Sequence, residues 1–280
     1  MKINIIRTLF AAFLASALIQ ACEPMEPSTY EERFMRFASV QYKDNAASLK
    51  IDYTGEVFNL YNFRTASDMQ RYRVKNGDRV LALMTLEAKG TIDNQRIFVD
   101  SLYKIPVEKV AESRPSDTLN FYYLLDPYRK YQLGNKQYPT IWSQGHFVNL
   151  TPFLYIRTED AKVKFYLYPT GVVTDTLEMM LYSDISDTFN PTYSSQYYQS
   201  MFCFDMSSMR DPVADAVENN RRDSLLSKFN GKDSIYVHVF MPDSLRVPTH
   251  VKYKDSSKDT VYNTYYFPKV SAKIAIPFDF

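Results

Sequence analysis

The chain has 280 residues, a formal net charge of +1 and only seven glycines. Its Lys and Arg residues are scattered rather than clustered, which does not favour binding to the phosphate backbone of a nucleic acid. The two closest glycines, Gly134 and Gly145, lie 11 positions apart, so the sequence has neither a dinucleotide fingerprint nor a P-loop. A GxSxG nucleophile elbow is also absent.

The first 21 residues predict a lipoprotein signal peptide. Lys2 and Arg7 form a basic start, residues 9–19 form an apolar run, and a small residue precedes Cys22. The run is about half as long as the roughly 20 residues that a membrane-spanning helix needs. The sequence IQAC at 19–22 resembles the bacterial lipobox, in which the cysteine thiol receives a diacylglycerol. The alternative is an ordinary signal peptide that leaves a secreted protein without lipid.

Residues 22–30 predict a short tether behind the lipid. The segment is polar, and Pro24 and Pro27 stiffen it. Each buried methylene of an acyl chain contributes about 0.8 kcal/mol, so two or three chains hold a protein firmly. We therefore expect a protein anchored to the outer membrane through Cys22, facing either the periplasm or the cell exterior.

Beyond the tether, the sequence predicts short strands and little helix. Polar and apolar residues alternate in four runs: 48–54, 162–168, 233–241 and 271–278. This is the two-residue period of half-buried strands, and it favours an all-β sandwich or barrel. The polar segment 111–118 is the expected boundary between two domains.

Two segments depart from this strand pattern. Residues 28–37 fit a short helix with Thr29 as its N-cap, but they also fit a strand. Residues 210–230 fit a helix better, because Asp211 is a suitable N-cap and Pro212 suits the first helical position. We interpret this second segment as a helical or loop insertion between strands.

Four further segments follow one another in a distinctive order. They are KNGDRVLALMTLEAKG at 75–90, RIFVDSLYKIPVEKV at 96–110, IWSQGHFVNL at 141–150 and FCFDMSSM at 202–209. This order resembles the NigD-like family of bacterial lipoproteins. The resemblance implies an OB-like β-barrel over residues 31–115 and a β-sandwich over residues 116–280, behind a lipobox. It implies no particular biochemical activity.

Neither the cysteines nor the histidines predict a metal site or a cofactor. With Cys22 acylated, Cys203 has no disulfide partner, and its apolar neighbours favour a small buried side chain. His238 and His250 are equally far from Ser244 in sequence, so a hairpin centred there would place the two rings opposite each other. Two imidazoles fall short of the four ligands of a stable zinc site, so the pair is a weak candidate.

Five aromatic residues in loop-like segments form a candidate glycan-binding surface. They are Tyr138, Trp142, Tyr193, Tyr197 and Tyr198. Aromatic rings offer apolar faces for sugar rings, and tyrosine-rich polar segments are typical of adaptable binding surfaces. The alternative is that these are ordinary strand or packing residues, because tyrosine favours strands.

A triplet of Asp, Ser or Thr, and an aliphatic residue recurs along the chain, at Asp117 and Asp243 among other positions. It resembles the O-glycosylation sequon of some exported bacterial proteins. Thr118 and Ser244 are the preferred candidate acceptors. The alternative is structural, since Asp with Ser or Thr closes turns ahead of a strand.

The residues favour a non-catalytic protein. With 32 acidic residues, carboxylate pairs arise by chance, and no pair is marked out as the one that glycoside hydrolysis needs. We expect an interaction or structural role at the cell envelope, with an unknown envelope protein or glycan as partner. A glycan-binding surface lipoprotein is the alternative, and an envelope hydrolase is a third hypothesis.

Overall fold

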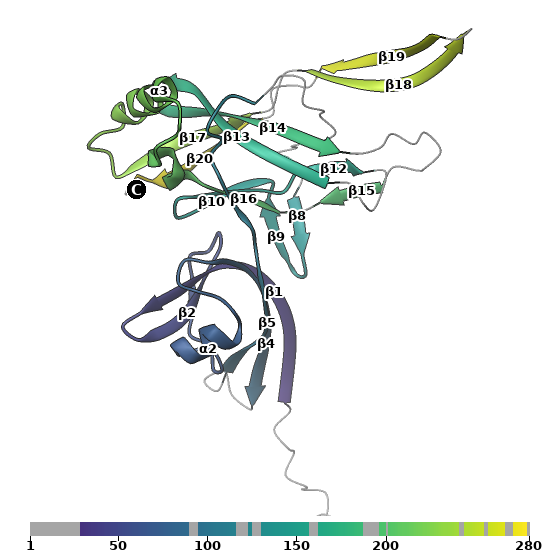
Figure 1. The fold of residues 1–280 in the computed structure, drawn as a ribbon. Helices are drawn as coiled ribbons and strands as arrows, with labels where there is room; N and C mark the ends of the chain where they lie inside the picture. The colour runs from purple at the N-terminus through teal and green to yellow at the C-terminus, as the bar shows by residue number, and fades with distance from the viewer. Residues whose placement is uncertain are drawn as a thin grey trace, which may run out of the picture.

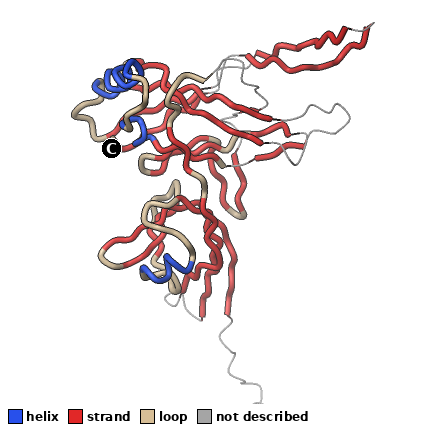
Figure 2. Tube along the Cα trace, viewed as in Figure 1, coloured by secondary structure: helices blue, strands red, loops and turns tan. Residues whose placement is uncertain are grey.

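The chain is largely strand. The computed structural model describes residues 29–89, 95–115, 123–124, 130–156, 162–186, 196–199, 201–240, 244–254, 257–266 and 271–278. The predominance of strands confirms the predicted all-β fold. Two parts follow one another and lie end to end in Figures 1 and 2: an N-terminal part, residues 29–104, and a C-terminal part, residues 107–278.

The N-terminal part is a five-stranded antiparallel sheet in the order β3-β2-β1-β4-β5. The strands are β1 Thr29–Lys43, β2 Ala46–Ile51, β3 Val57–Phe58, β4 Arg79–Lys89 and β5 Gln95–Lys104. Because side chains alternate across a strand, one set, which includes Val40, Leu49 and Met84, faces a shared core. The short helix α2 (Ala66–Arg71) adds Met69 to this core.

Residues 29–37 lie in β1, so the strand alternative for this segment is confirmed and the helix is not formed. Alternation along β1 brings Phe34 against the core of the N-terminal part. The two edges of the sheet approach each other, because the N–H of Tyr61, which follows β3, donates to the carbonyl of Ile97 in β5 at 2.8 Å. An OB-like barrel for this part stays a prediction.

The C-terminal part contains two four-stranded sheets, in the orders β10-β11-β16-β6 and β13-β14-β17-β20. A three-stranded sheet, β15-β12-β7, and the hairpins β8-β9 and β18-β19 accompany them. The strands are β6 Val107–Lys109, β7 Tyr123–Leu124, β8 Lys130–Leu133, β9 Lys136–Pro139, β10 Ile141–Gln144, β11 Phe147–Leu150, β12 Phe153–Ile156, β13 Lys162–Val173, β14 Thr176–Ser186, β15 Gln196–Gln199, β16 Phe202–Asp205, β17 Ser234–Phe240, β18 Ser244–Lys254, β19 Ser257–Tyr266 and β20 Ser271–Pro277. Val148 and Phe204 of the first sheet share a core with Leu167, Leu181 and Val237 of the second, as in a sandwich.

The chain passes between the two parts at residues 105 and 106. β5 ends at Lys104, and β6 already pairs in parallel with β16 of the C-terminal part. By its hydrogen bonds, β6 therefore belongs to the C-terminal part, although it precedes the predicted boundary after residue 115.

A helical insertion lies between β16 and β17, where the sequence predicts one. It consists of the 3-10 helix η2 (Met206–Arg210) and the helix α3 (Ala216–Ser227). The N-cap of α3 is Asp215, so the predicted N-cap at Asp211 is wrong. Asp211 instead follows η2 as its C-cap, and this leaves Pro212 outside the helix.

Candidate functional site

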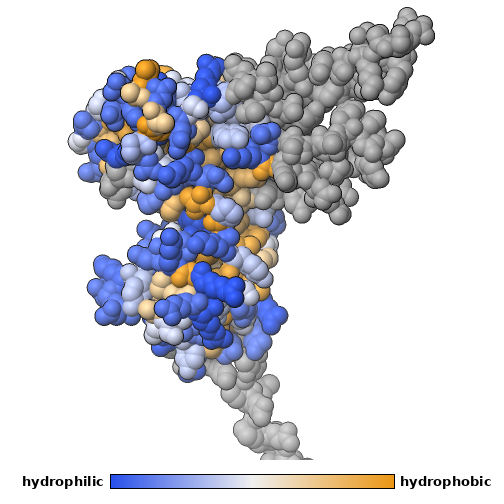
Figure 3. All heavy atoms as spheres, in the orientation of Figure 1, coloured by the Kyte–Doolittle hydropathy of each residue, from blue (hydrophilic) through white to orange (hydrophobic). Residues whose placement is uncertain are grey.

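The two parts meet at an aromatic cluster. The ring centroid of Phe37 in β1 lies 5.0 Å from that of Tyr138 in β9 and 5.7 Å from that of Trp142 in β10. Because Ala38 faces the N-terminal core, strand alternation turns Phe37 the other way, toward the C-terminal part. The buried residues that complete the cluster are Ile105, Leu133 and Cys203. On the face in view, Figure 3 shows apolar side chains gathered where the two parts meet.

A buried ion pair lies beside this cluster. The side chains of Arg79, at the start of β4, and Asp52, which follows β2, are both 0% exposed. The Arg79 guanidinium donates to both carboxylate oxygens, with 2.6 Å between Nη1 and Oδ1. Trp142 Nε1 donates to the same carboxylate at 2.9 Å, and Asn149 Oδ1 accepts from Arg79 Nη2 at 3.1 Å. Since Trp142 and Asn149 belong to the C-terminal part, the ion pair joins the two parts.

Tyr138 and Trp142 are not surface residues. Their exposed fractions are 0% and 3%. Burial raises the pKa of Tyr138 to about 12, and its hydroxyl accepts a hydrogen bond from the N–H of Phe37 at 3.3 Å. Rings packed against the other part of the chain cannot stack on a sugar. The predicted contribution of these two residues to an exposed glycan-binding surface is therefore wrong.

An open cavity of about 480 Å³ lies beside the junction. The N-terminal part contributes Lys50, Tyr53 and Thr54 to its lining, and the C-terminal part contributes Trp142, Gln144 and Ile274 among others. None of the residues that line this cavity is Asp or Glu. The cavity is therefore formed by both parts together, and its one charged lining side chain is a cation.

Tyr53 is the exposed aromatic residue of this cavity. Its backbone φ is +67°, in the left-handed region that bulky side chains rarely adopt. The residue is 63% exposed, and Lys136 Nζ of the β8-β9 hairpin lies 5.9 Å from the ring centroid. The sequence interpretation missed Tyr53, because DYTGE at 52–56 has the composition of an ordinary turn.

His238 pairs with a carboxylate and not with His250. Its Nδ1 lies 2.7 Å from Oε2 of Glu178, because β14 and β17 are parallel neighbours with these two residues in register. On the other side, β20 places Lys273 opposite His238. β18, which begins at Ser244 and contains His250, pairs with β19 instead. The predicted hairpin between the two histidines is therefore wrong, because β17 already has a neighbour on each side.

A second open cavity, of about 510 Å³, lies over this row of residues and is lined by Asp175, Glu178, His238 and Lys273 among others. Lys273 Nζ lies 3.7 Å from Oδ1 of Asp175, so the Asp175 carboxylate is paired with this lysine. Among the described residues, no group of three or more His, Cys, Asp or Glu side chains is placed to hold a metal ion. The described residues of this row therefore form one His–Glu pair and one Lys–Asp pair.

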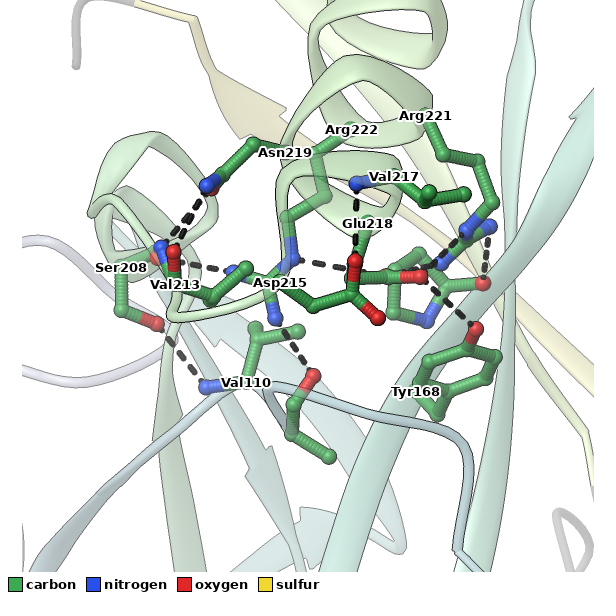
Figure 4. A network of polar contacts seen from close by, with 12 residues as sticks. Val110, Tyr168, Ser208, Val213, Asp215, Val217, Glu218, Asn219, Arg221 and Arg222 are labelled. Carbon is green, nitrogen blue, oxygen red and sulfur yellow. Dashed lines mark hydrogen bonds and ion pairs between the residues drawn. The ribbon is translucent and has the colours of Figure 1, made fainter.

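Charged residues of α3 fasten the helix to the structure beneath it (Figure 4). Arg221 Nε donates to Oε2 of Glu218 at 2.9 Å, and the Tyr168 hydroxyl donates to the same oxygen at 3.3 Å. Arg222 is 1% exposed, and its Nη1 donates to the carbonyl of Ser208 in η2 at 3.3 Å. This network orders the insertion, and the carboxylate of Glu218 is occupied by partners within the chain.

Cys203 is buried, as predicted, with 0% exposure. Burial raises the pKa of its thiol to about 11. Because the thiolate is the nucleophilic form, a thiol with this pKa is inert at neutral pH. Cys203 thus serves packing at the junction.

The other predicted site residues are only partly described. Cys22, Thr118 and Tyr193 lie outside the described residues. Tyr197 and Tyr198 lie in β15, paired with β12, so their backbone is strand rather than loop. Ser244 begins β18, and the side chains of these three residues lie outside the described part. Within the described residues, no helix is both long and apolar enough to cross a bilayer.

No protein-family model and no curated protein matches the sequence. Solved structures do match. An uncharacterized protein from Parabacteroides merdae is 12% identical, with 87% of this chain and 98% of that chain covered and a TM-score of 0.45. A proposed lipoprotein from Bacteroides fragilis is 11% identical, with coverages of 87% and 97% and a TM-score of 0.46. A NigD-like immunity protein from Bacteroides caccae is 12% identical, with coverages of 84% and 96% and a TM-score of 0.37. One of the matched structures is therefore named for the family that the sequence resembles.

Proposed function

We propose that this chain is a lipid-anchored protein of the cell envelope with a non-catalytic binding role. The observation that carries the proposal is the lining of the cavity at the junction, which includes Tyr53 and Lys50 but no carboxylate. Hydrolysis of a glycosidic bond needs two carboxyl groups about 5 to 10 Å apart. This cavity lacks that pair, whereas an exposed ring beside a cation is suited to binding.

Two buried or half-buried groups of charged side chains support the same role. The Arg79–Asp52 pair has no contact with solvent, and Glu218 is held by Arg221 and Tyr168. An envelope hydrolase, the third hypothesis, could use the partly exposed His238–Glu178 pair of the second cavity. Hydrolysis of an envelope polysaccharide that is lost in Glu178→Gln would contradict the non-catalytic role.

The anchor is proposed from the N-terminal sequence. Cys22 is the acceptor within IQAC, and Thr29, where β1 begins, lies seven positions further along the chain. At about 3.5 Å per extended residue, this tether would hold the start of β1 within about 25 Å of the lipid. Figure 1 shows that this end of β1 lies away from the C-terminal part. The N-terminal part would thus lie near the membrane, and we propose the outer membrane as the location.

Membrane retention tests the anchor, and the two cysteines provide a matched pair of variants. Wild type and Cys203→Ala are expected in the membrane fraction, because both keep Cys22. Cys22→Ala is expected in the soluble fraction. A wild type that fractionates as a soluble protein, or a Cys22→Ala variant that stays with the membrane, would contradict the anchor.

The alternative role, a glycan-binding surface, has Tyr193, Tyr197 and Tyr198 as its remaining candidate residues. O-glycosylation at Thr118 or Ser244 is a separate proposal, and a mass shift of the corresponding peptide in protein from the native envelope tests it. Loss of that shift in Thr118→Ala or Ser244→Ala is the expected result.

A further inference from the structure

We infer that the cavity beside the junction binds an acidic sugar, a pyranose that carries a carboxylate, with the ring of Tyr53 as its stacking platform. The inference rests on the proposed binding role and names a ligand class for it. Four features of the described residues carry it: the backbone of Tyr53, the exposure of its ring, the size of the cavity and the sign of the charge around it.

The backbone of Tyr53 is held in an unfavourable conformation from both sides. Asp52 before it is fixed by the buried pair with Arg79, and the N–H of Asp52 donates to the carbonyl of Phe37 at 2.9 Å. Gly55 after it has φ of +71°, and its N–H donates to the carbonyl of Ile51 at 3.0 Å. Strain of this kind persists where the surroundings impose it, and it concentrates at ligand sites.

The ring of Tyr53 gains little from packing that would offset this strain, since the residue is 63% exposed. Glycine adopts a positive φ without steric penalty, so it would suit this backbone better if stability alone mattered. The fold therefore presents a large flat ring to solvent from a fixed backbone. A preorganised aromatic ring is what stacking on the apolar face of a sugar requires.

The cavity has the size and the polar groups of a small-ligand site. Its volume of about 480 Å³ falls in the range of such sites, about 300 to 1,000 Å³. Thr54, Ser143 and Gln144 supply hydroxyl and amide groups to the lining. Ser143 Oγ donates to the carbonyl of Ala275 at 2.7 Å, which leaves its oxygen able to accept a hydrogen bond from a sugar hydroxyl.

The charge around the ring selects an anion. Lys50 lines the cavity, and Lys136 Nζ lies 5.9 Å from the centroid of the Tyr53 ring. The lining has no carboxylate that would repel an acidic ligand. The nearby Asp52 carboxylate is neutralised by Arg79 and has 0% exposure. A carboxylate on the stacked sugar would therefore meet the Lys50 ammonium in the cavity, with the Lys136 ammonium beside the ring.

Trp142, the only tryptophan of the chain, lines the cavity, so its fluorescence serves as the probe of binding. Purified mature protein is titrated with tetragalacturonate and, separately, with neutral maltotetraose while tryptophan fluorescence is recorded. A saturable change with the acidic probe is expected. The neutral probe is expected to bind at least about fivefold more weakly. No saturable change with tetragalacturonate, or equal affinity for both probes, would overturn the inference.

Variants separate binding from folding. Tyr53→Gly removes the ring and relieves the strain, so we expect binding about tenfold weaker with a melting temperature no lower than that of wild type. Lys136→Gln is expected to weaken binding of tetragalacturonate and to leave binding of maltotetraose unchanged. Tyr61→Ala is the matched control, because Tyr61 is 46% exposed with Arg96 4.8 Å from its ring centroid but does not line the cavity. Wild-type affinity in Tyr53→Gly would overturn the inference, whereas the membrane retention of Cys22→Ala tests the anchor independently.

Discussion

Arg79 and Asp52 form an ion pair with 0% exposure where the two parts of the chain meet. They are 27 residues apart in the N-terminal part, yet both are bonded to the C-terminal part. Trp142 donates a hydrogen bond to Asp52, and Asn149 accepts one from Arg79. A buried charge that loses its partner is costly. The pair therefore links the stability of the N-terminal part to its contacts with the C-terminal part.

Arg79→Met is expected to lower the free energy of unfolding by about 3–5 kcal/mol, because the Asp52 carboxylate stays buried without its partner. Denaturant unfolding followed by Trp142 fluorescence measures this loss. In the double variant Arg79→Met/Asp52→Leu both charges are gone, so it should lose less than the sum of the single variants. Strictly additive losses would show that the two residues do not act as a pair.

The Glu218–Arg221 contact is expected to make stability depend on pH. Burial raises the pKa of Glu218, but the hydrogen bonds and charge of Arg221 hold it below the ordinary value of 4.5. A carboxyl group with a lowered folded-state pKa stabilises the fold above its unfolded pKa, and this contribution is lost as the pH falls through the folded pKa. Wild type should exceed Glu218→Gln in melting temperature at pH 7, and the difference should shrink below pH 4.5. A difference that stays constant from neutral to acid pH would refute this role.

Cys203 is expected to resist thiol reagents in the folded protein. A thiol pKa of about 11 against the ordinary 9.0 leaves about 100-fold less thiolate at pH 8, and the side chain is also buried. Absorbance with Ellman's reagent measures the rate, with protein unfolded in denaturant as the control. Equal rates in the folded and unfolded protein would mean that this thiol is accessible.

Patterns within one segment predicted local structure well. Alternation at 162–168 and 271–278 indicated strands, and these residues form β13 and β20. The apolar neighbours of Cys203 indicated its burial. The sequence also carries a local signal for α2, because Thr65 and Asp68 have the spacing of the capping box that they form at its start.

Features that depend on distant parts of the chain were not predictable in this way. Tyr138 looked like a loop residue, but the group that buries it, Phe37, is 101 residues away. His238 looked paired with His250 because a hairpin is the simplest local arrangement, whereas its partner Glu178 comes from a parallel strand 60 residues away. The cavity likewise combines both parts, and its exposed aromatic residue, Tyr53, lies in an ordinary turn sequence of the N-terminal part.

The central claim is that the junction makes the two parts one body, which carries the binding cavity. Spin labels on Val57→Cys and Val173→Cys, at positions 49% and 61% exposed, place one label in each part. The distance between them, measured by double electron–electron resonance, is the most direct test. We predict one narrow distribution that broadens when Arg79→Met is added. A broad or two-peaked distribution with Arg79 and Asp52 intact would contradict the claim.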